Sequence, residues 1–367
     1  MRSHCSIFLL ATFLAFSIQA SVHAHIITVE PGESIQAAID SANAGDIIEV
    51  QSAIYQENLN ITKQLALQGI GTPVLDAGGK GSTVFFLAEG ISLQGFKLTR
   101  ASAQGAGINV SNVSNNNIIK NNIIEYNDGN GIDLWASTNN SIEGNTIKNN
   151  GGNGIGIWSC EKSRIFKNDI TENNGAGIFG GSSNGSIEDN NLRSNGGSGM
   201  ILLNSFSNNI SHNRAAENQE NGIMIIFSSD NHIEGNSAQN SSLSGISLLF
   251  SWKNNISDNA VLGNMVGLQL GNSSENNQIF DNQIVSNRLG ISISLSSQNV
   301  IDHNYLGNNG YDSYDEGENQ WDDGVGGNFY LGWTCEDLNG DEICDSSRNI
   351  PGGTGVDRYP LASWSSL

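Results

Sequence analysis

The stretch SIEGNTIKNNGGNGIGI, residues 141–157, decides the fold, because its pattern occurs nine times between Ile119 and Asn309. Each copy reads Ile, two variable residues, Asn, one variable residue, Ile, two variable residues, Asn, a short gap, and then Gly-Ile-x-Leu or a close variant. A fixed period of this size is typical of a solenoid, whose units bury their apolar residues by stacking on one another. The first asparagines of the copies, spaced by 22 or 23 residues, are Asn122, Asn145, Asn168, Asn190, Asn213, Asn236, Asn259, Asn282 and Asn304.

Composition selects among three solenoid architectures: a leucine-rich horseshoe, a helical repeat and a parallel β-helix. Asn and Gly are poor helix formers, which disfavours a helical repeat. Apolar and polar residues alternate in runs such as residues 131–134, which is strand spacing, and no Leu-x-x-Leu-x-Leu frame is present. The repeats therefore predict an all-β, single-stranded right-handed parallel β-helix with three short strands per coil.

The asparagines and glycines have physical roles in such a coil. Asn tolerates the left-handed backbone conformation of a tight corner, and Gly adopts it without penalty. Identical Asn side chains one coil apart, roughly 4.8 Å along the axis, can form amide ladders. Deviations from the repeat pattern are conservative. Ser241 stands where other copies have their second Asn, and Ala215 and Ala238 stand where other copies have their second Ile.

The sequence divides into four segments. Residues 1–24 are expected to form a signal peptide, with Arg2 before an apolar run at residues 7–18 and a Val22-His23-Ala24 exit after it. The run is too short to span a bilayer. Residues 25–100 form an N-terminal cap and irregular first coils, with a short amphipathic capping helix expected at residues 34–39. Residues 101–309 are the regular repeats, and residues 310–367 are an acidic C-terminal segment.

The net charge of −21 excludes nucleic acid and anionic membranes as partners. With a signal peptide and no second apolar stretch, we expect an exported, soluble monomer without a membrane span. The localisation predicted is secreted or cell-surface, in the extracellular space or the periplasm.

The outward positions of the Gly-Ile-x-Leu runs carry the functional signal of the repeats. In successive coils they stack into two columns that are apolar or aromatic where polar residues are expected. The first column is Asp133, Gly156, Phe179, Ile201, Met224, Ser247, Gln269 and Ser292. The second column is Trp135, Trp158, Gly181, Leu203, Ile226, Leu249, Gly271 and Ser294.

Three explanations remain open for this apolar face. The C-terminal segment folds back over it, or a protein partner covers it, or it is a carbohydrate platform. In the platform, the indoles of Trp135 and Trp158 and the ring of Phe179 contact sugar rings, while Asp133 accepts hydroxyl hydrogen bonds.

Catalytic residues are harder to find. Glycoside hydrolysis needs two carboxyl groups on one face. Asp258 and Asp281 occupy equivalent positions in neighbouring coils, about 5 Å apart, with His303 one coil further on. These three residues are the best acid/base candidates, against the alternative of solvated surface acids.

The acidic C-terminal segment contains a candidate calcium loop. Oxygen ligands at alternate positions are typical of a calcium-binding loop, although this loop lacks the Gly and final Glu of an EF-hand. The candidate ligands are Asp337, Asn339, Asp341, Ile343 through its carbonyl, and Asp345. Cys335 and Cys344 bracket a turn-rich loop that holds all of these residues except Asp345, and they are candidates for a disulfide, which leaves Cys160 as a packed thiol.

The repeats resemble the PbH1 β-helix repeats of the NosD-like and carbohydrate-binding/sugar-hydrolase group, whose fold is the pectin-lyase-like solenoid. Residues 32–60, 321–330, 337–345 and 352–361 resemble NosD-like cell-surface proteins of methanogenic archaea. The resemblance implies polysaccharide binding or processing at the cell surface. The alternatives are a polysaccharide lyase, hydrolase or epimerase, and a periplasmic accessory to copper-site assembly, although the six His and four Met form no local cluster of soft ligands.

Overall fold

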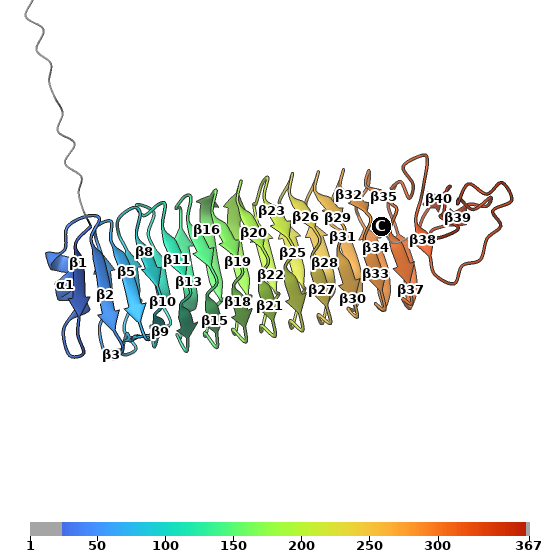
Figure 1. Ribbon diagram of the computed structural model, residues 1–367. Coiled ribbons are helices and arrows are strands. Elements are labelled where there is room, and N and C mark those ends of the chain that lie inside the picture. Colours follow the sequence, from blue (N-terminus) through green and yellow to red (C-terminus); the bar gives the residue numbers. More distant parts are fainter. Residues whose placement is uncertain (1–23, 365–367) are drawn as a thin grey trace, which may run out of the picture.

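The computed structural model describes residues 24–364, and the predicted signal peptide lies outside the described residues except for Ala24. These residues form a right-handed parallel β-helix of about 13 coils, drawn in Figure 1 as a long stack of short strands. Three parallel sheets run along the axis and are named here A, B and C. The fold class predicted from the repeats is therefore confirmed.

Each sheet takes one strand from each coil, in chain order. Sheet A comprises β1 (Ile26–Val29), β2 (Ile47–Gln51), β5 (Ala66–Ile70), β8 (Ser92–Gln94), β11 (Ile118–Lys120), β14 (Ser141–Glu143), β17 (Arg164–Phe166), β20 (Ser186–Glu188), β23 (Asn209–Ser211), β26 (His232–Glu234), β29 (Asn255–Ser257), β32 (Gln278–Phe280) and β35 (Val300–Asp302). Sheet B comprises β3 (Ile54–Tyr55), β6 (Val74–Asp76), β9 (Lys97–Thr99), β12 (Ile123–Glu125), β15 (Thr146–Lys148), β18 (Asp169–Thr171), β21 (Asn191–Arg193), β24 (Arg214–Ala216), β27 (Ser237–Gln239), β30 (Ala260–Leu262), β33 (Gln283–Val285), β36 (Tyr305–Gly307) and β38 (Phe329–Tyr330). Sheet C comprises β4 (Leu59–Ile61), β7 (Val84–Phe86), β10 (Ala106–Val110), β13 (Asn130–Trp135), β16 (Ile155–Glu161), β19 (Ile178–Ser183), β22 (Met200–Leu203), β25 (Ile223–Ile226), β28 (Ser244–Leu249), β31 (Val266–Gly271), β34 (Leu289–Ser294) and β37 (Tyr311–Asp315).

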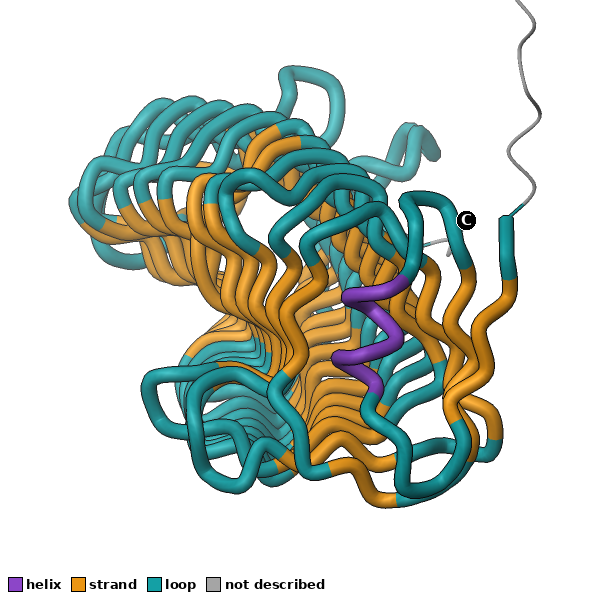
Figure 2. The backbone as a smooth tube through the Cα atoms, turned by 90° about the vertical axis from the view of Figure 1, so that its left-hand side faces the viewer, coloured by secondary structure: helices purple, strands orange, loops and turns teal. Residues whose placement is uncertain are grey.

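A short helix caps the N-terminal end of the solenoid. Helix α1 (Ile35–Ser41) buries Ile35 and Ile39, and the Ser34 hydroxyl accepts the backbone N–H of Ala37 as an N-cap. Figure 2, which looks towards this end, shows α1 lying across the first coils. The helix thus covers core side chains that have no preceding coil to stack on, as the sequence predicts.

The core is a set of stacked aliphatic columns. In sheet C the inward column is fully buried in every regular coil: Ile132, Ile155, Ile178, Met200, Ile223, Ile246, Leu268 and Ile291. Burying one such side chain contributes about 1.5–3 kcal/mol relative to leaving it exposed. Because the regular coils stay in register apart from one shift between β16 and β19, the repeat period places their outward side chains in columns.

Asparagine ladders line the corners of the coil. The side-chain Oδ1 of Asn145 accepts both the backbone N–H and the Nδ2 of Asn122, at 3.0 and 3.1 Å, while its own Nδ2 donates to the Ile119 carbonyl at 2.9 Å. The same contacts continue through Asn304 to Asn328. These bonds satisfy the buried amides and fix the spacing of the coils.

Two ladders follow from the two asparagines of each repeat, and the second includes Asn127, Asn150 and Asn173. A third ladder was not predicted. It runs along the corner between sheets C and A, where the Oδ1 of Asn254 accepts the N–H and Nδ2 of Asn231 at 3.1 and 2.9 Å. Its members are Asn117, Asn140, Asn208, Asn231, Asn254, Asn277, Asn299 and Asn319. Two coils interrupt it, with Ser163 and Gly185 in the equivalent positions.

The C-terminal segment packs on the last coils. Arg358 forms a two-pronged ion pair with the Asp322 carboxylate, at 2.9 and 2.6 Å, and the backbone N–H of Gly327 donates to the Tyr359 carbonyl. A disulfide joins Cys335 to Cys344. The short antiparallel pair β39 (Arg348–Asn349) and β40 (Val356–Asp357) lies in this segment, at the orange-red end of Figure 1.

This placement corrects one explanation for the apolar face of sheet C. As far as residue 364, the C-terminal segment contacts the last coils, so it does not fold back over Trp135 and its neighbours. Trp135 is 47 % exposed. The physical reason is that Arg358 and Asp357 are held by partners in the last coils, Asp322 and Asn328.

Candidate functional sites: an aromatic platform and an acidic cleft

Trp135, Trp158 and Phe179 form an aromatic platform on the outer face of sheet C. Strands β13 and β16 place Trp135 directly beside Trp158. The indole rings stack with centroids 5.3 Å apart and planes 20° apart, and Phe179 follows at 5.4 Å with a tilt of 59°. The structure therefore brings together three of the four residues predicted to bind substrate.

The stacking covers one face of Trp135, which is 47 % exposed. Trp158 lies over one face of Trp135, so the rings stand as a column along the solenoid axis and cannot both lie flat against one sugar chain. On the other side of Trp135, the outward positions of the preceding coil hold the short side chains of Asn109 and Ser111. A ligand ring on this side would continue the stack.

Asp133, the fourth predicted residue, lies beside the platform. Its Oδ1 accepts a hydrogen bond from the Nδ2 of Asn130 at 2.7 Å. Burial raises the pKa of the Asp133 carboxyl, and this hydrogen bond opposes the shift. The next position of its column is Gly156, where a Cβ would crowd both Asp133 and the indole Nε1 of Trp158. Within the described residues, that buried Nε1 has no hydrogen-bond partner.

A groove of about 350 Å³ adjoins Trp158. It arises from a register shift between β16 and β19, where Ile157 pairs with Gly180 but Cys160 pairs with Ser182. The coil that contains Gly180 is one residue shorter than its predecessor at this corner, and Gly180 has φ of +133°. Glu161 and Asn204 contribute polar side chains to the groove. The 22-residue step from Asn168 to Asn190 is the sequence feature that reflects this shorter coil. The groove itself was not predicted from it.

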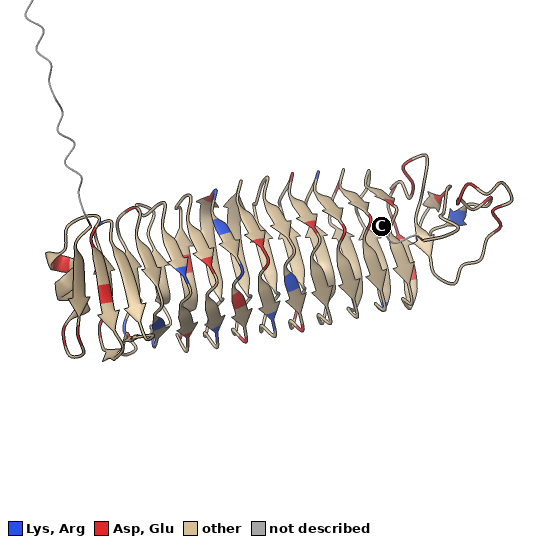
Figure 3. Ribbon diagram, viewed as in Figure 1, with Lys and Arg blue, Asp and Glu red and all other residues tan. Residues whose placement is uncertain are grey.

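Beyond the groove the wall of sheet C is apolar and uncharged. Leu203, Ile226 and Leu249 stand in register and are half-buried. At the adjoining corner the rings of Phe227 and Phe250 stack with centroids 4.7 Å apart. Figure 3 shows acidic residues in the first coils, along the solenoid and in the C-terminal segment. With a net charge of −21, the chain places this apolar surface on a strongly acidic molecule.

The predicted acid/base residues line a second site, an acidic cleft. Asp258, Asp281 and His303 occupy the corner between sheets A and B in three successive coils, each with φ near +55°. Together with the C-terminal segment they line a cleft of about 420 Å³. Sequence reasoning missed its opposite wall, formed by Val325, Gly326, Asp341, Glu342, Ile343, Leu361, Ser363 and Trp364.

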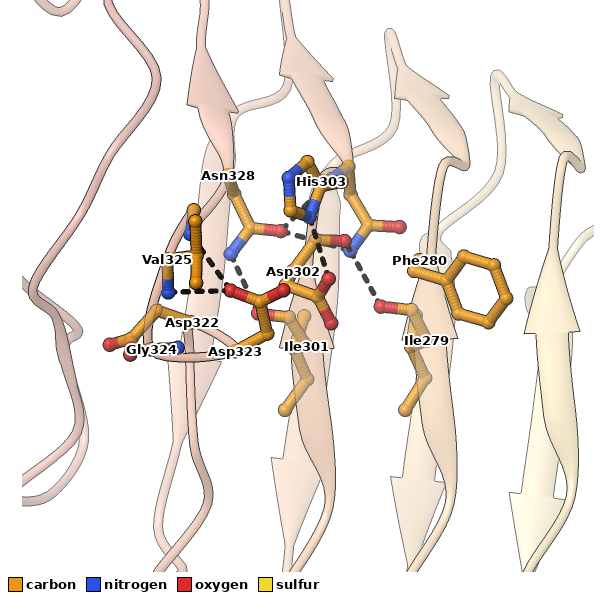
Figure 4. A network of polar contacts seen from close by, with 12 residues as sticks. Ile279, Phe280, Ile301, Asp302, His303, Asp322, Asp323, Gly324, Val325 and Asn328 are labelled. Carbon is orange, nitrogen blue, oxygen red and sulfur yellow. Dashed lines mark hydrogen bonds and ion pairs between the residues drawn. The ribbon is translucent and has the colours of Figure 1, made fainter. Parts of the chain in front are cut away.

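The electrostatics of the cleft are dominated by carboxylates. Burial raises the pKa of Asp281, and the neighbouring charge of Asp258 raises it further. Burial also raises the pKa of Asp302, whose Oδ2 lies 2.7 Å from the Nδ1 of His303. Figure 4 shows Asp302, His303 and the turn that contains Asp323 converging on one another.

The predicted calcium loop forms a closed turn. Asp337 accepts hydrogen bonds from the backbone N–H groups of Gly340, Asp341 and Glu342, and Asp345 accepts one from Leu338. Among the described residues, three His, Cys, Asp or Glu side chains bring ligand atoms within 4.8 Å of one another in a single place, and that group is Asp302, His303 and Asp323. Calcium binding by the loop stays a prediction.

Two family models match overlapping parts of the chain. Residues 84–238 match the right handed beta helix region, and residues 181–335 match the family described as periplasmic copper-binding protein (NosD). The chain is thus a right-handed parallel β-helix protein with NosD-like repeats, as the resemblance indicated. No curated protein sequence matches the chain. Within residues 24–364, no helix has the length and hydrophobicity that a membrane crossing requires.

Solved structures share the fold at low sequence identity. The A-module of the Azotobacter vinelandii mannuronan C-5 epimerase AlgE4 is 16 % identical, with a TM-score of 0.66, over 78 % of this chain and 92 % of that one. The Dettilon tailspike protein is 16 % identical, with a TM-score of 0.62, over 73 % of this chain and 61 % of the tailspike. The catalytic domain of a GH87 α-1,3-glucanase, in complex with tetrasaccharides, is 12 % identical, with a TM-score of 0.55, over 81 % and 66 % of the two chains.

Proposed function

We propose that this protein is exported and binds a polysaccharide at the cell surface or in the periplasm, through the aromatic platform of sheet C. The observation that carries the proposal is the stack of Trp135, which is 47 % exposed, on Trp158, with a polar groove beside it. Aromatic faces are large, rigid surfaces that suit the apolar faces of sugar rings.

The platform also has the polar groups that orientation of a sugar requires. Asp133 and Asn130 lie at its base, and Glu161 and Asn204 line the groove next to it. A binding site that combines apolar faces with a few placed polar groups is typical of small-ligand recognition. The fold supports the proposal as well, since the epimerase and glucanase that share it act on polysaccharides by their names.

The acidity of the chain restricts the class of polysaccharide that suits this surface. A net charge of −21 repels a polyanion, and the described part of the outer wall from Gly156 to Ser294 carries no charged residue in its two columns. The ligand that suits this surface is a neutral polysaccharide, or an anionic one only where cations bridge it.

A glycan array tests the proposal. We expect the mature chain to bind a subset of neutral glycans and the W135A/W158A double variant to lose that binding. The matched control is W252A, because Trp252 is exposed to a similar extent, 40 %, but lies at a corner of a later coil. Equal binding by the double variant and the wild type would show that the platform is not the binding site.

A second candidate function is catalysis on the same class of polymer at the acidic cleft. The observation that favours it is the meeting of Asp258, Asp281 and His303 in one cleft, where the pKa of Asp281 is raised as a general acid requires. A product assay on the glycans that bind separates the two functions. Cleaved or epimerised product that disappears in D281N would establish an enzyme, and unchanged glycans would leave a binding protein.

A further inference from the structure

We infer that Asp302, His303 and Asp323 form a binding site for a divalent transition metal ion, with Zn²⁺ as the representative ion. The site lies at the wall of the acidic cleft, several coils from the aromatic platform, and does not rest on polysaccharide binding. One ligand atom from each of the three residues lies within 4.8 Å of the other two.

Two different parts of the chain supply the ligands. Asp302 ends β35 on sheet A, and His303 follows it in the left-handed corner conformation, with φ of +51°. Asp323 comes from the C-terminal segment, 20 residues later in sequence. A bound ion would therefore join the last regular coil to the segment that covers it.

Backbone contacts position the Asp323 carboxylate. Its Oδ1 accepts the N–H groups of Val325 and Gly326 at 2.7 and 2.8 Å, which leaves Oδ2 without a hydrogen bond among the described residues. Gly326 lets this turn approach the imidazole, because a Cβ there would lie 2.6 Å from the Nε2 of His303. The turn in Figure 4 thus places a carboxylate beside the ring without closing over it.

The charge around the imidazole favours a cation. The cleft is lined by Asp258, Asp281, Asp341 and Glu342, and no lysine or arginine is among its described lining residues. Asp302 and Asp323 add two further carboxylates next to His303. Since His303 is the one basic side chain among these groups, a divalent cation would offset their mutual repulsion.

The ligand types select the metal. Calcium and magnesium take oxygen ligands, whereas one imidazole nitrogen with two carboxylates suits Zn²⁺ and its first-row neighbours. Three protein ligands leave a fourth position for water or for a group of a ligand in the cleft. The site therefore differs in both residues and chemistry from the predicted calcium loop at 337–345.

Isothermal titration of the chelator-stripped mature chain with Zn²⁺ tests the inference. We expect one equivalent to bind, and the D302N and D323N variants to bind about tenfold to hundredfold more weakly. D323N keeps an oxygen for the N–H groups of Val325 and Gly326, so the turn is preserved. H303N is expected to abolish binding, and Asn suits its left-handed corner.

The matched control is H212N. His212 occupies the same corner column with φ of +56°, and the next position of its column is Gly235. Retention of the wild-type affinity in H212N, with excess Ca²⁺ failing to displace Zn²⁺, supports the site. Absence of binding, equal affinity in H303N and wild type, or displacement by equimolar Ca²⁺ would overturn it. Co²⁺ absorption bands that disappear in H303N give a second readout, independent of heat.

Discussion

The Oδ2 of Asp357 accepts the backbone N–H of Asn328 at 2.8 Å and thereby closes the asparagine ladder that begins at Asn122. The hydroxyl of Tyr330 donates to the same oxygen at 3.0 Å. At every earlier ladder position the backbone N–H donates to the amide oxygen of the next coil, so at Asn328 a carboxylate takes the place of the missing coil. The C-terminal segment is thus attached to the solenoid through its hydrogen-bond pattern as well as through apolar contact.

The stability of the C-terminal end should fall as pH rises. Burial raises the pKa of Asp357 from 3.8 to about 6. The folded state therefore binds the proton more tightly than the unfolded state, and this contribution is present below pH 4 and lost as pH rises to 6. The loss amounts to about 3 kcal/mol. Urea unfolding at pH 4 and pH 7 measures it, and D357N should flatten the difference. Stability that increases over this range in the wild type but not in D357N would contradict the assignment.

Breaking a ladder in its middle should destabilise the whole solenoid. N236A removes the acceptor for the N–H and Nδ2 of Asn213 and the donor to the Ile210 carbonyl. Each buried group left unpaired costs about 1–3 kcal/mol, so a loss of at least 3 kcal/mol is expected in urea unfolding. The exposed N209A is the control and should change stability by less than about 0.5 kcal/mol. Similar losses in both variants would show that the ladder has no special role.

Calcium should stabilise the predicted calcium loop at residues 337–345. The carboxylates of this nine-residue segment repel one another without a cation, and they belong to Asp337, Asp341, Glu342 and Asp345. Addition of calcium to the metal-free chain is expected to raise Tm, and D341N should reduce the increase. Identical melting midpoints with and without calcium would show that the loop is an ordinary acidic turn.

The groove beside Trp158 should depend on Gly180. A Cβ at this residue would collide with the Ile157 carbonyl, and its φ of +133° disfavours any side chain. G180A is therefore expected to destabilise the fold by about 1–3 kcal/mol. The matched substitution is G271A, because Gly271 has no positive φ and the nearest atom to a Cβ there is the flexible end of the Leu249 side chain. Thermal unfolding compares the two, and an unaffected G180A would mean that the bulge adapts freely.

The repeats were sufficient to predict the architecture because the period of 22 or 23 residues fixes which side chains share a column. The pairing of Asp133 with Gly156 and of Trp135 with Trp158 follows from that register alone. The third ladder was missed, although Asn117, Asn140 and Asn208 each stand five residues before a first asparagine. Its interruption at Ser163 and Gly185 hid the pattern.

Other features of the sites lay beyond the repeat. The period places Trp135 beside Trp158 but does not set the rotamers that stack their rings and close one face of each. The acidic column was visible in the sequence, but its cleft depends on the C-terminal segment, which has no period. The position of that segment is set by individual contacts such as Arg358 with Asp322 and Asp357 with Asn328. Such contacts between residues about 30 positions apart carry no local sequence signal.

The proposed polysaccharide binding depends most directly on the exposed part of Trp135. Ser111 stands at the next outward position of the stack, so S111W would place an indole where the sugar ring is expected. Isothermal titration with the glycan selected by the array measures the effect, with circular dichroism to verify the fold. The account predicts at least about tenfold weaker binding by S111W than by wild type, since the site would already be filled. An unchanged Kd in a correctly folded S111W would contradict it.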